Sequence, residues 1–442
     1  MIEKITLYLI TLLVYVPGLI YAIKIEKISR YPILLFCFIG MFIFNALGSI
    51  FIMFPDLFTR TNFFSHKYIL MLNLQAIIFY VVTLIYFHFK KNISRKKVCK
   101  ITFVDKLLRY FLIIILGIFL GLFFWQVGNP PLLEILTGNL DSYSKIISYR
   151  TEKVYSNKYG ILPVMSLYVL PILTAVYIFA ESSLKKKRSY YDYLLIFGCI
   201  FIVALPGGKG NILDIVTALF IAYLLLGGTR GVPKARKPIV YAQLLFWLSA
   251  ALMPVAILYK FYYSTVLSGV EIFKSFVYRI IGVYSESMAA TVAYSETKGF
   301  LEGITFPRFK GFLHTSQPID LGEVMSQFIF NSEGSAPVSA LAEGYINFGW
   351  IGFILITIIT FILIILLEET LKSIPQNMLT FSLIVSYCMF ATKISQISIF
   401  AFILEPSFNL LFALIIGMRY LFFWFYSEIK IQKAQLRSQK EI

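Results

Sequence analysis

The sequence predicts an all-α protein that crosses a membrane many times, and three observations support this. Of the 442 residues, 59% are hydrophobic and only 14% are charged, whereas soluble domains are about a quarter charged. Apolar runs near the ~20 residues that span a bilayer as a helix recur along the whole chain. These runs are unbroken, and they therefore predict helices, because the strands of a membrane barrel are shorter and alternate.

About eleven apolar runs have the length of a transmembrane helix. In chain order they cover residues 4–23, 32–54, 68–89, 107–127, 161–181, 190–206, 211–227, 239–262, 346–367, 377–403 and 406–427. The first run lacks a small-residue cleavage site after it, so we expect a retained helix and not a signal peptide. Nothing between the runs has the size of an ordinary soluble domain, and residues 1–442 are expected to form a single integral membrane domain.

The formal net charge of +17 is concentrated in short connecting segments and the C-terminal tail. Basic clusters lie at residues 24–30, 90–100, 185–188, 229–237 and 430–440, each after an odd-numbered run. This positive-inside pattern places the N-terminus outside and the C-terminus in the cytoplasm. The segment EETLKS (368–373) fits the pattern least well. The basic clusters are explained by topology and by contact with anionic lipid, so no nucleic-acid partner is expected.

Two long segments are then expected on the outer face, at residues 128–160 and 263–345. Long loops in compact proteins usually carry function or are disordered. The second is rich in aromatic residues, which disordered segments lack, so we expect it to fold back as short helices. Residues 271–294 have helical apolar spacing and should lie at the interface with their charges outward, or cover a cavity.

Cations from three separate segments face outward in this topology, against the positive-inside bias. They are Lys145, Arg150, Lys153, Lys158, Lys209, Lys274, Arg279, Lys298, Arg308 and Lys310. The collection indicates an anionic ligand outside, such as a phosphate that arginine can grip with two hydrogen bonds. The alternative for each is a solvated charge or a contact with a lipid headgroup.

Lys209 has the strongest individual argument. It lies in ALPGGKGNILDI (204–215), a tight connection between two apolar runs. Glycines leave the backbone N–H groups accessible, and a helix expected to begin near Asn211 points its positive end at the same place, which favours an anion. The alternative is a hairpin with a lysine that reaches the interface.

Three further residues on the predicted outer face are candidates for function. Glu343 precedes an apolar run, where a carboxylate is costly unless it has a partner or a task; helix N-terminal charge stabilisation is the alternative. His314 is a candidate general base in the large loop, although a lone histidine is more often a surface residue. Lys393 is expected either to join the anion site or to pair with a carboxylate.

The four cysteines are scattered, without CxxC spacing, and none falls in an outer loop. We therefore expect no structural disulfide. The three histidines form no HExxH or Cys/His cluster, so neither a metal nor another cofactor is expected.

Two motifs resemble those of the Wzy-type O-antigen and capsular polysaccharide repeat-unit polymerases, relatives of the O-antigen ligases. PGGKGNILDIVTALFIAYLLL (206–226) is similar to a family segment in which arginine is usual where Lys209 stands. ALAEGYINFGWIGFILI (340–356) is similar to a family entry to a late helix, through Glu343, Tyr345, Asn347, Phe348, Gly349 and Gly352. The two motifs cover some forty residues, and the placement of the loops also fits. The Arg-x10-Gly pattern of some members is not matched after Arg150 or Arg308, and the histidine of the ligases is missing from GSAPVSAL (334–341).

The resemblance implies a GT-C-like, metal-independent, inverting glycosyltransferase in the bacterial inner membrane. It would join polyprenyl (undecaprenyl) diphosphate-linked repeat units into capsule or the O-antigen of lipopolysaccharide. Lys209, Arg150, Arg279, Arg308, Lys393, Tyr345 and Asn347 would bind diphosphate or sugar, and Glu343, Glu323 or His314 would act as base. Implied partners are the lipid-linked donor and acceptor, membrane lipid and a chain-length regulator protein. Two alternatives stay open, a ligase-type transferase and a lipid-linked oligosaccharide flippase; the sequence shows no internal repeat of the kind transporters carry.

Overall fold

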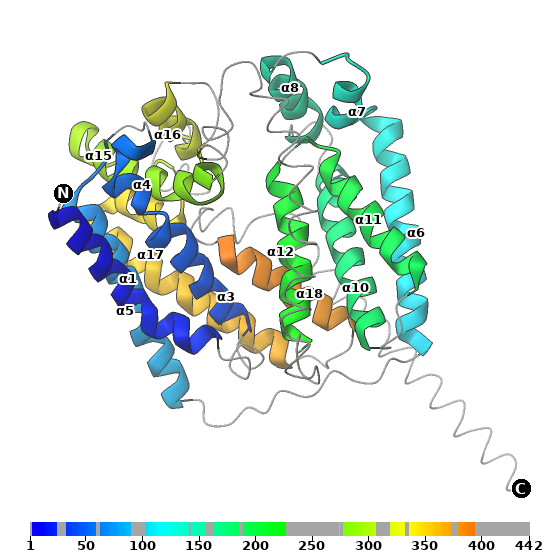
Figure 1. Cartoon of the computed structure of the whole chain (residues 1–442), viewed down its shortest axis with the longest axis horizontal. Coiled ribbons are helices and arrows are strands. Elements are labelled where there is room, and N and C mark those ends of the chain that lie inside the picture. Colours follow the sequence, from blue (N-terminus) through cyan, green and yellow to red (C-terminus); the bar gives the residue numbers. More distant parts are fainter. Residues whose placement is uncertain are drawn as a thin grey trace, which may run out of the picture. The chain divides into compact units, whose positions relative to one another are not determined.

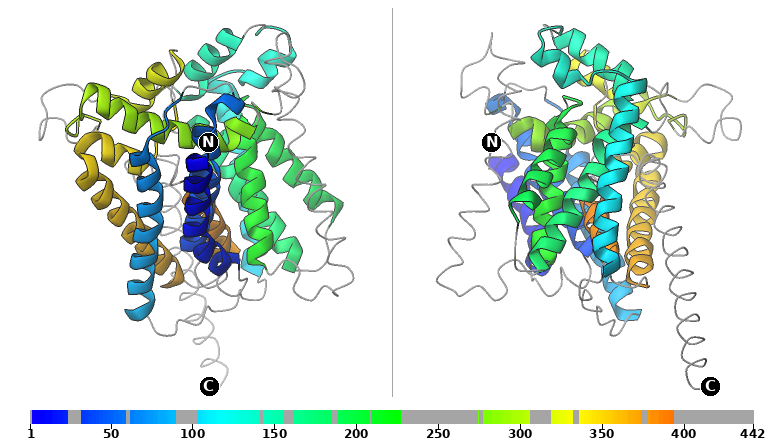
Figure 2. Two further views of the ribbon diagram at one scale, coloured as in Figure 1. Left: turned by 60° about the vertical axis from the view of Figure 1, so that its left-hand side comes forward. Right: turned by 90° about the vertical axis from the view of Figure 1, so that its right-hand side faces the viewer.

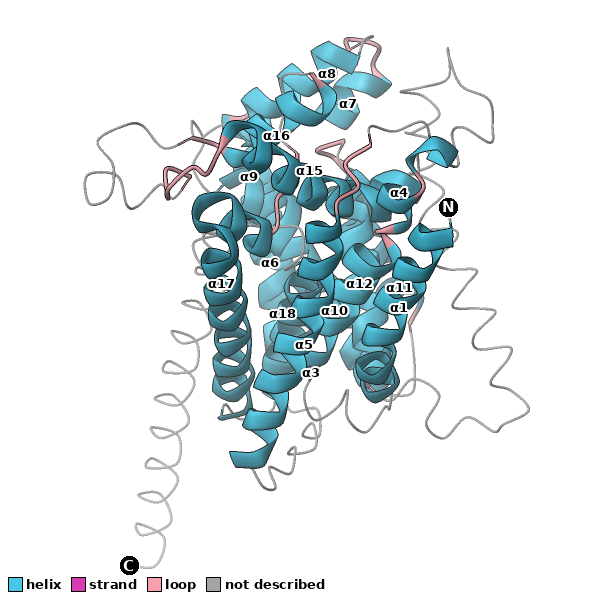
Figure 3. Cartoon of the chain, turned by 90° about the vertical axis from the view of Figure 1, so that its left-hand side faces the viewer, coloured by secondary structure: helices cyan, strands magenta, loops and turns pink. Residues whose placement is uncertain are grey.

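The computed structural model describes residues 2–23, 32–58, 62–89, 103–140, 143–155, 162–184, 189–207, 209–226, 274, 277–305, 319–331, 336–373 and 378–393. Every regular element within these ranges is a helix, and none is a strand (Figure 3). The all-α prediction is therefore confirmed for the described part of the chain.

One group of helices comes from both ends of the described chain. It contains α1 (Ile2–Ile23), α3 (Pro32–Met41), the π-helical turn η1 (Phe42–Leu47), α4 (Ile50–Met53), η2 (Pro55–Phe58) and α5 (His66–Phe89). The late helices α15 (Val283–Lys298), α16 (Leu321–Phe330) and α17 (Ala340–Ser373) pack onto them, after the π-turn η7 (Tyr278–Gly282). Their shared core includes Tyr68, Met288, Leu341 and Phe353.

A second group is continuous in sequence. It runs through α6 (Phe103–Gln126), α7 (Pro131–Leu136), α8 (Tyr143–Arg150), η3 (Thr151–Tyr155), α9 (Leu162–Val164), η5 (Met165–Val169), α10 (Leu170–Leu184), α11 (Tyr190–Ala204) and α12 (Lys209–Leu225). Helix α18 (Met378–Thr392) contacts α3 of the first group and α10 and α12 of the second (Figure 1). It therefore joins the two groups.

Nine of the eleven predicted spans coincide with described helices, and the predicted spans 239–262 and 406–427 lie outside the described residues. Within the described ranges, six helical segments are long and apolar enough to cross a membrane: Ile2–Tyr21, Pro32–Met53, His66–Phe89, Leu107–Gln126, Leu162–Leu184 and Ala340–Leu371. Three shorter apolar helices, Tyr190–Ala204, Gly210–Leu225 and Met378–Thr392, occupy three more predicted positions.

The predicted outer loops both contain short helices. Helices α7 and α8 come from the first, and α15 and α16 from the second, and all four lie at the same end of the bundle in the different views (Figures 1 and 2). In the first loop, Glu134 accepts hydrogen bonds from Asn129 (2.7 Å) and Asn139 (2.6 Å). These bonds, that from Asn139 first, lower the pKa of Glu134 because they stabilise its charged form.

Among the described charged residues of 271–294, Lys274 is exposed and Arg279 half-buried, so the expectation of outward charges fails only at Glu286 of helix α15. Glu286 is buried, 2% exposed, and accepts a hydrogen bond from the Tyr278 hydroxyl. The helix is covered on several sides by α17, α16, α5 and α4. A helix enclosed in this way must bring its polar groups inward, where they need partners.

Glu368 and Glu369 are the acidic residues of the segment 368–373, which fits the positive-inside pattern least well. Both form hydrogen bonds with other helices. Glu368, 2% exposed, accepts hydrogen bonds from the backbone N–H groups of Ile33 (2.7 Å) and Leu34 (3.2 Å) in the first turn of α3. Glu369 accepts a bond from Tyr86, near the end of α5. A carboxylate from a distant helix thus satisfies N–H groups that a helix start leaves without partners.

Candidate functional site

The second motif of the sequence, residues 340–356, forms a sharp bend within α17. The backbone leaves helical geometry at Phe348 and at Gly349, whose φ of 62° and ψ of −145° are accessible to glycine. The bend brings the backbones at Gly344 and Gly352 together: a Cβ built on Gly352 would lie 2.1 Å from the Gly344 carbonyl oxygen. Three glycines of the motif therefore make the bend possible.

We expect Gly352→Ala to destabilise the protein by about 1–3 kcal/mol or more, because the added methyl group meets backbone that cannot turn away. Thermal unfolding of the purified protein, followed by loss of the monodisperse size-exclusion peak, measures this. Gly121→Ala in α6 is the matched control, since no atom lies within 4 Å of its Cβ; it should be neutral or stabilising by about 0.5–1 kcal/mol. Equal stability of the two variants would contradict the tight bend.

Glu343 lies just before this bend, inside a network of buried polar groups. Its Oε1 accepts a hydrogen bond from the Thr305 hydroxyl (3.2 Å), and that hydroxyl oxygen accepts one from Asn347 Nδ2 (2.7 Å). Asn347 Nδ2 also donates to the Glu343 carbonyl (2.8 Å), and its Oδ1 accepts from the Gly303 N–H (2.8 Å). Glu343, Asn347 and Thr305 are 3%, 1% and 5% exposed. We call these three residues the Glu343 cluster.

The turn that carries Thr305 is tied to α17 by its backbone. Leu301 N–H donates to Ile346 O (2.9 Å) and Glu302 N–H to Asn347 O (3.1 Å). Tyr345, 3% exposed, packs edge-on against Phe300 of the turn and against Trp350. Tyr345 and Asn347, predicted to bind substrate, therefore act in this structure as core and scaffold groups around Glu343.

A second polar cluster joins three helices. Lys393, directly after α18, places its Nζ 2.5 Å from Asp214 Oδ2 of α12 and 3.1 Å from the Tyr168 hydroxyl of η5. The Tyr168 hydroxyl donates to the same Asp214 oxygen (2.6 Å). Of the two uses expected for Lys393, the structure shows the pairing with a carboxylate. The three residues form the Lys393 cluster.

Removing the charge of Lys393 is expected to leave Asp214 buried without its cation. We predict that Lys393→Met destabilises the protein by about 3–5 kcal/mol, as for other broken buried pairs, and that Lys393→Met with Asp214→Leu recovers most of the loss. Thermal unfolding of the single and double variants gives the coupling free energy. If the two single effects simply add, Lys393 and Asp214 do not form the pair.

Helix α15 packs against the Glu343 cluster. Its residues Met288, Ala289 and Val292 share a hydrophobic core with the helical turn of α17 that carries Glu343. Near the start of α15, burial raises the pKa of Tyr284, and the charge of Asp214 adds to this increase.

The remaining predicted residues are dispersed. Lys209 is the first residue of α12, which begins two residues earlier than the predicted start near Asn211; its side chain lies outside the described residues. Arg150 ends α8 and is half-buried, Arg279 stacks on the Phe330 ring at 5.7 Å, and Glu323 is exposed on α16. Arg308 and His314 lie outside the described residues. The described residues contain no group of three or more His, Cys, Asp or Glu side chains arranged to hold a metal ion. Cys37, Cys199 and Cys388 are buried and form no disulfide within the described part of the chain.

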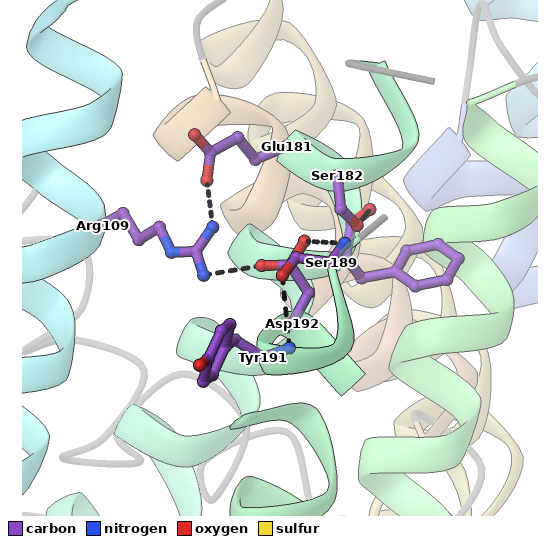
Figure 4. Close-up of polar contacts among 7 residues, drawn as sticks. Arg109, Glu181, Ser182, Ser189, Tyr191 and Asp192 are labelled. Atoms are coloured by element: carbon purple, nitrogen blue, oxygen red, sulfur yellow. Dashed lines mark hydrogen bonds and ion pairs between the residues drawn. The ribbon is translucent and has the colours of Figure 1, made fainter. Parts of the chain in front are cut away.

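Sequence reasoning did not single out Asp214, Tyr168, Thr305 or the ion-pair network of Arg109. Arg109 of α6 binds Glu181 of α10 (3.2 Å) and Asp192 of α11 (2.6 Å), as Figure 4 shows. Asp192 also completes a capping box with Ser189 at the start of α11. A signal was available for Arg109 and Asp214, because both are ionised residues inside apolar runs, where charge requires a partner.

The helices and their buried polar clusters define an all-helical membrane protein with several membrane-spanning segments, by the length and composition of those helices. Comparison with protein-family models, with curated proteins and with solved structures finds no match to the chain. The functional argument consequently depends on the residues and their geometry.

Proposed function

We propose that the protein is a Wzy-type polysaccharide polymerase, a GT-C-like glycosyltransferase that joins polyprenyl-diphosphate-linked repeat units on the extracytoplasmic face of the bacterial inner membrane. The observation that carries the proposal is the Glu343 carboxylate, buried at the bend of α17 and held by the Thr305 hydroxyl. Burying a carboxylate is costly unless the carboxylate has hydrogen-bond partners. A buried carboxylate in a membrane protein is therefore a candidate functional group.

The chemistry requires a proton acceptor and positive charge. The hydroxyl of the acceptor sugar attacks the anomeric carbon of the donor, a new C–O bond forms, and the bond to the diphosphate breaks. Glu343 receives the hydroxyl proton as general base. The polyprenyl diphosphate leaves with the bonding electron pair, and this gain of negative charge favours a site lined with cations.

The N-terminus of α12 supplies one part of that cationic site. Lys209 is its first residue, and the helix start adds backbone N–H groups that favour a phosphate. Arg150, Arg279 and Arg308 are further candidates from the two outer loops, whose helices α7, α8, α15 and α16 lie at one end of the bundle. In this proposal that end faces outward, the chain has eleven spans, the C-terminus is cytoplasmic, and direct displacement inverts the anomeric centre.

The deciding experiment incubates the purified full-length protein in detergent with the lipid-linked repeat units of its native glycan. A ladder of longer lipid-linked products is the expected result, and Lys209→Ala with Arg150→Ala should abolish it. A flippase would leave the units unchanged, because detergent removes the two sides on which a transporter works. A ligase would transfer glycan to a different acceptor without making a ladder. Either outcome, or normal ladders from the double variant, would overturn the proposal.

A further inference from the structure

The side-chain amides of Asn45 and Gln75 form a buried pair within the first group of helices, and this pair is joined by a single hydrogen bond. Asn45 of η1 donates from Nδ2 to Gln75 Oε1 of α5 at 2.8 Å, and the two residues are 1% and 0% exposed. The other two atoms of the pair, Asn45 Oδ1 and Gln75 Nε2, are buried and have no hydrogen-bond partner. One acceptor and one donor are therefore left over.

Flipping the side-chain amides, so that oxygen and nitrogen exchange places, does not remove the unpartnered donor and acceptor. Turning one amide would place two donors or two acceptors face to face, and turning both would again leave one NH2 group and one carbonyl. Each buried polar atom without a partner costs about 1–3 kcal/mol. The site therefore favours a bound group that both donates and accepts.

The surroundings are polar on further sides. Asn45 lies in a π-helical turn, a widened geometry that occurs often at functional sites. Ser285 of α15 donates to Phe44 O (2.7 Å) and contacts Asn45 O (3.2 Å). Tyr68 lies two helical turns before Gln75 on the same face of α5, is fully buried, and its hydroxyl has no hydrogen-bond partner among the described residues. The residues named here are uncharged, so they offer no counter-charge to an ion.

We infer that Asn45 and Gln75 form an internal water-binding site, in which water donates to Asn45 Oδ1 and accepts from Gln75 Nε2. Water is the smallest group that meets both demands, and buried waters typically make about three hydrogen bonds to polar atoms of this kind. The water would join η1 to α5.

X-ray radiolytic footprinting of the purified full-length protein tests this, because bound water generates hydroxyl radicals at buried sites. The reporter is Tyr68 and the matched control is Tyr177 of α10, since both tyrosines are 0% exposed. Tyr68 should be modified at least about fivefold faster than Tyr177, because it lies on the face of α5 that carries Gln75 and has a buried hydroxyl without a partner among the described residues. Equal rates would overturn the inference.

A variant supplies the second measurement. Asn45→Leu with Gln75→Leu removes both the acceptor and the donor that would bind the water. Modification of Tyr68 should therefore fall to the rate of Tyr177. An unchanged Tyr68 rate in a folded double variant would show that the water is held elsewhere and would also overturn the inference. The wild-type comparison of the two tyrosines decides the matter even if the double variant fails to fold.

Discussion

Replacing Arg109 with methionine is expected to destabilise the protein by about 3–5 kcal/mol, the cost of leaving buried charge without its partner. The guanidinium is shared by two carboxylates whose side chains are 0% and 8% exposed, Glu181 and Asp192. Methionine fills a similar volume and suits the apolar surroundings, so loss of charge and not loss of packing dominates the effect. Thermal unfolding in detergent and the yield of monodisperse protein measure it.

Two further variants separate charge from geometry at Arg109. Lysine keeps the charge but not the planar fork that reaches α10 and α11 together, so Arg109→Lys should recover only part of the loss. Arg109→Met combined with Glu181→Gln and Asp192→Asn removes all three charges and should be more stable than Arg109→Met alone. If neutralising the two carboxylates gives no recovery, the network does not hold α6 against α10 and α11.

Glu343→Gln is expected to abolish polymer formation while leaving the protein folded. Glutamine preserves the shape of the side chain and can still accept the Thr305 hydrogen bond, but it cannot take up the proton of the acceptor hydroxyl. A lost general base usually costs about 10²–10⁴-fold in rate. Product ladders from purified protein measure the rate, and thermal unfolding verifies that the variant is folded.

The controls for Glu343→Gln come from neighbouring carboxylates. Glu302→Gln changes an exposed residue in the same turn as Thr305 and should leave the rate within about twofold, as surface substitutions usually do little. Glu323→Gln tests the other acidic candidate for the base. Loss of activity in Glu323→Gln with retention in Glu343→Gln would reject Glu343 as the base.

The lengths and order of the apolar runs were sufficient to predict most of the described helices. The runs at 68–89 and 107–127 correspond closely to α5 and α6. Periodicity and length are local properties of the sequence. In lipid, a single chain segment can satisfy all of its backbone hydrogen bonds only as a helix. The glycines around Lys209 predicted a helix start near Asn211, and α12 begins two residues earlier, at Lys209.

The same local signals could not reveal partners from distant segments. Glu343 was a candidate from its position alone, but the Thr305 that holds it lies in another part of the chain. Tyr345 was a candidate ligand-binding residue from its motif, but the contacts of its ring with Phe300 and Trp350 could not be read from the sequence. The residue type alone does not distinguish a side chain that packs in the core from one that contacts substrate.

The sequence by itself determined that the chain is helical, that its helices suit a membrane and where the bend-forming glycines stand. Only the tertiary structure decided that Lys393 pairs with Asp214, that Glu368 satisfies the start of α3 and that Arg109 joins three helices. The physical reason is that helix formation depends on neighbours three and four residues away. The pairing of buried charges instead depends on which helices pack together, because each charge must find a partner wherever the fold brings one within reach.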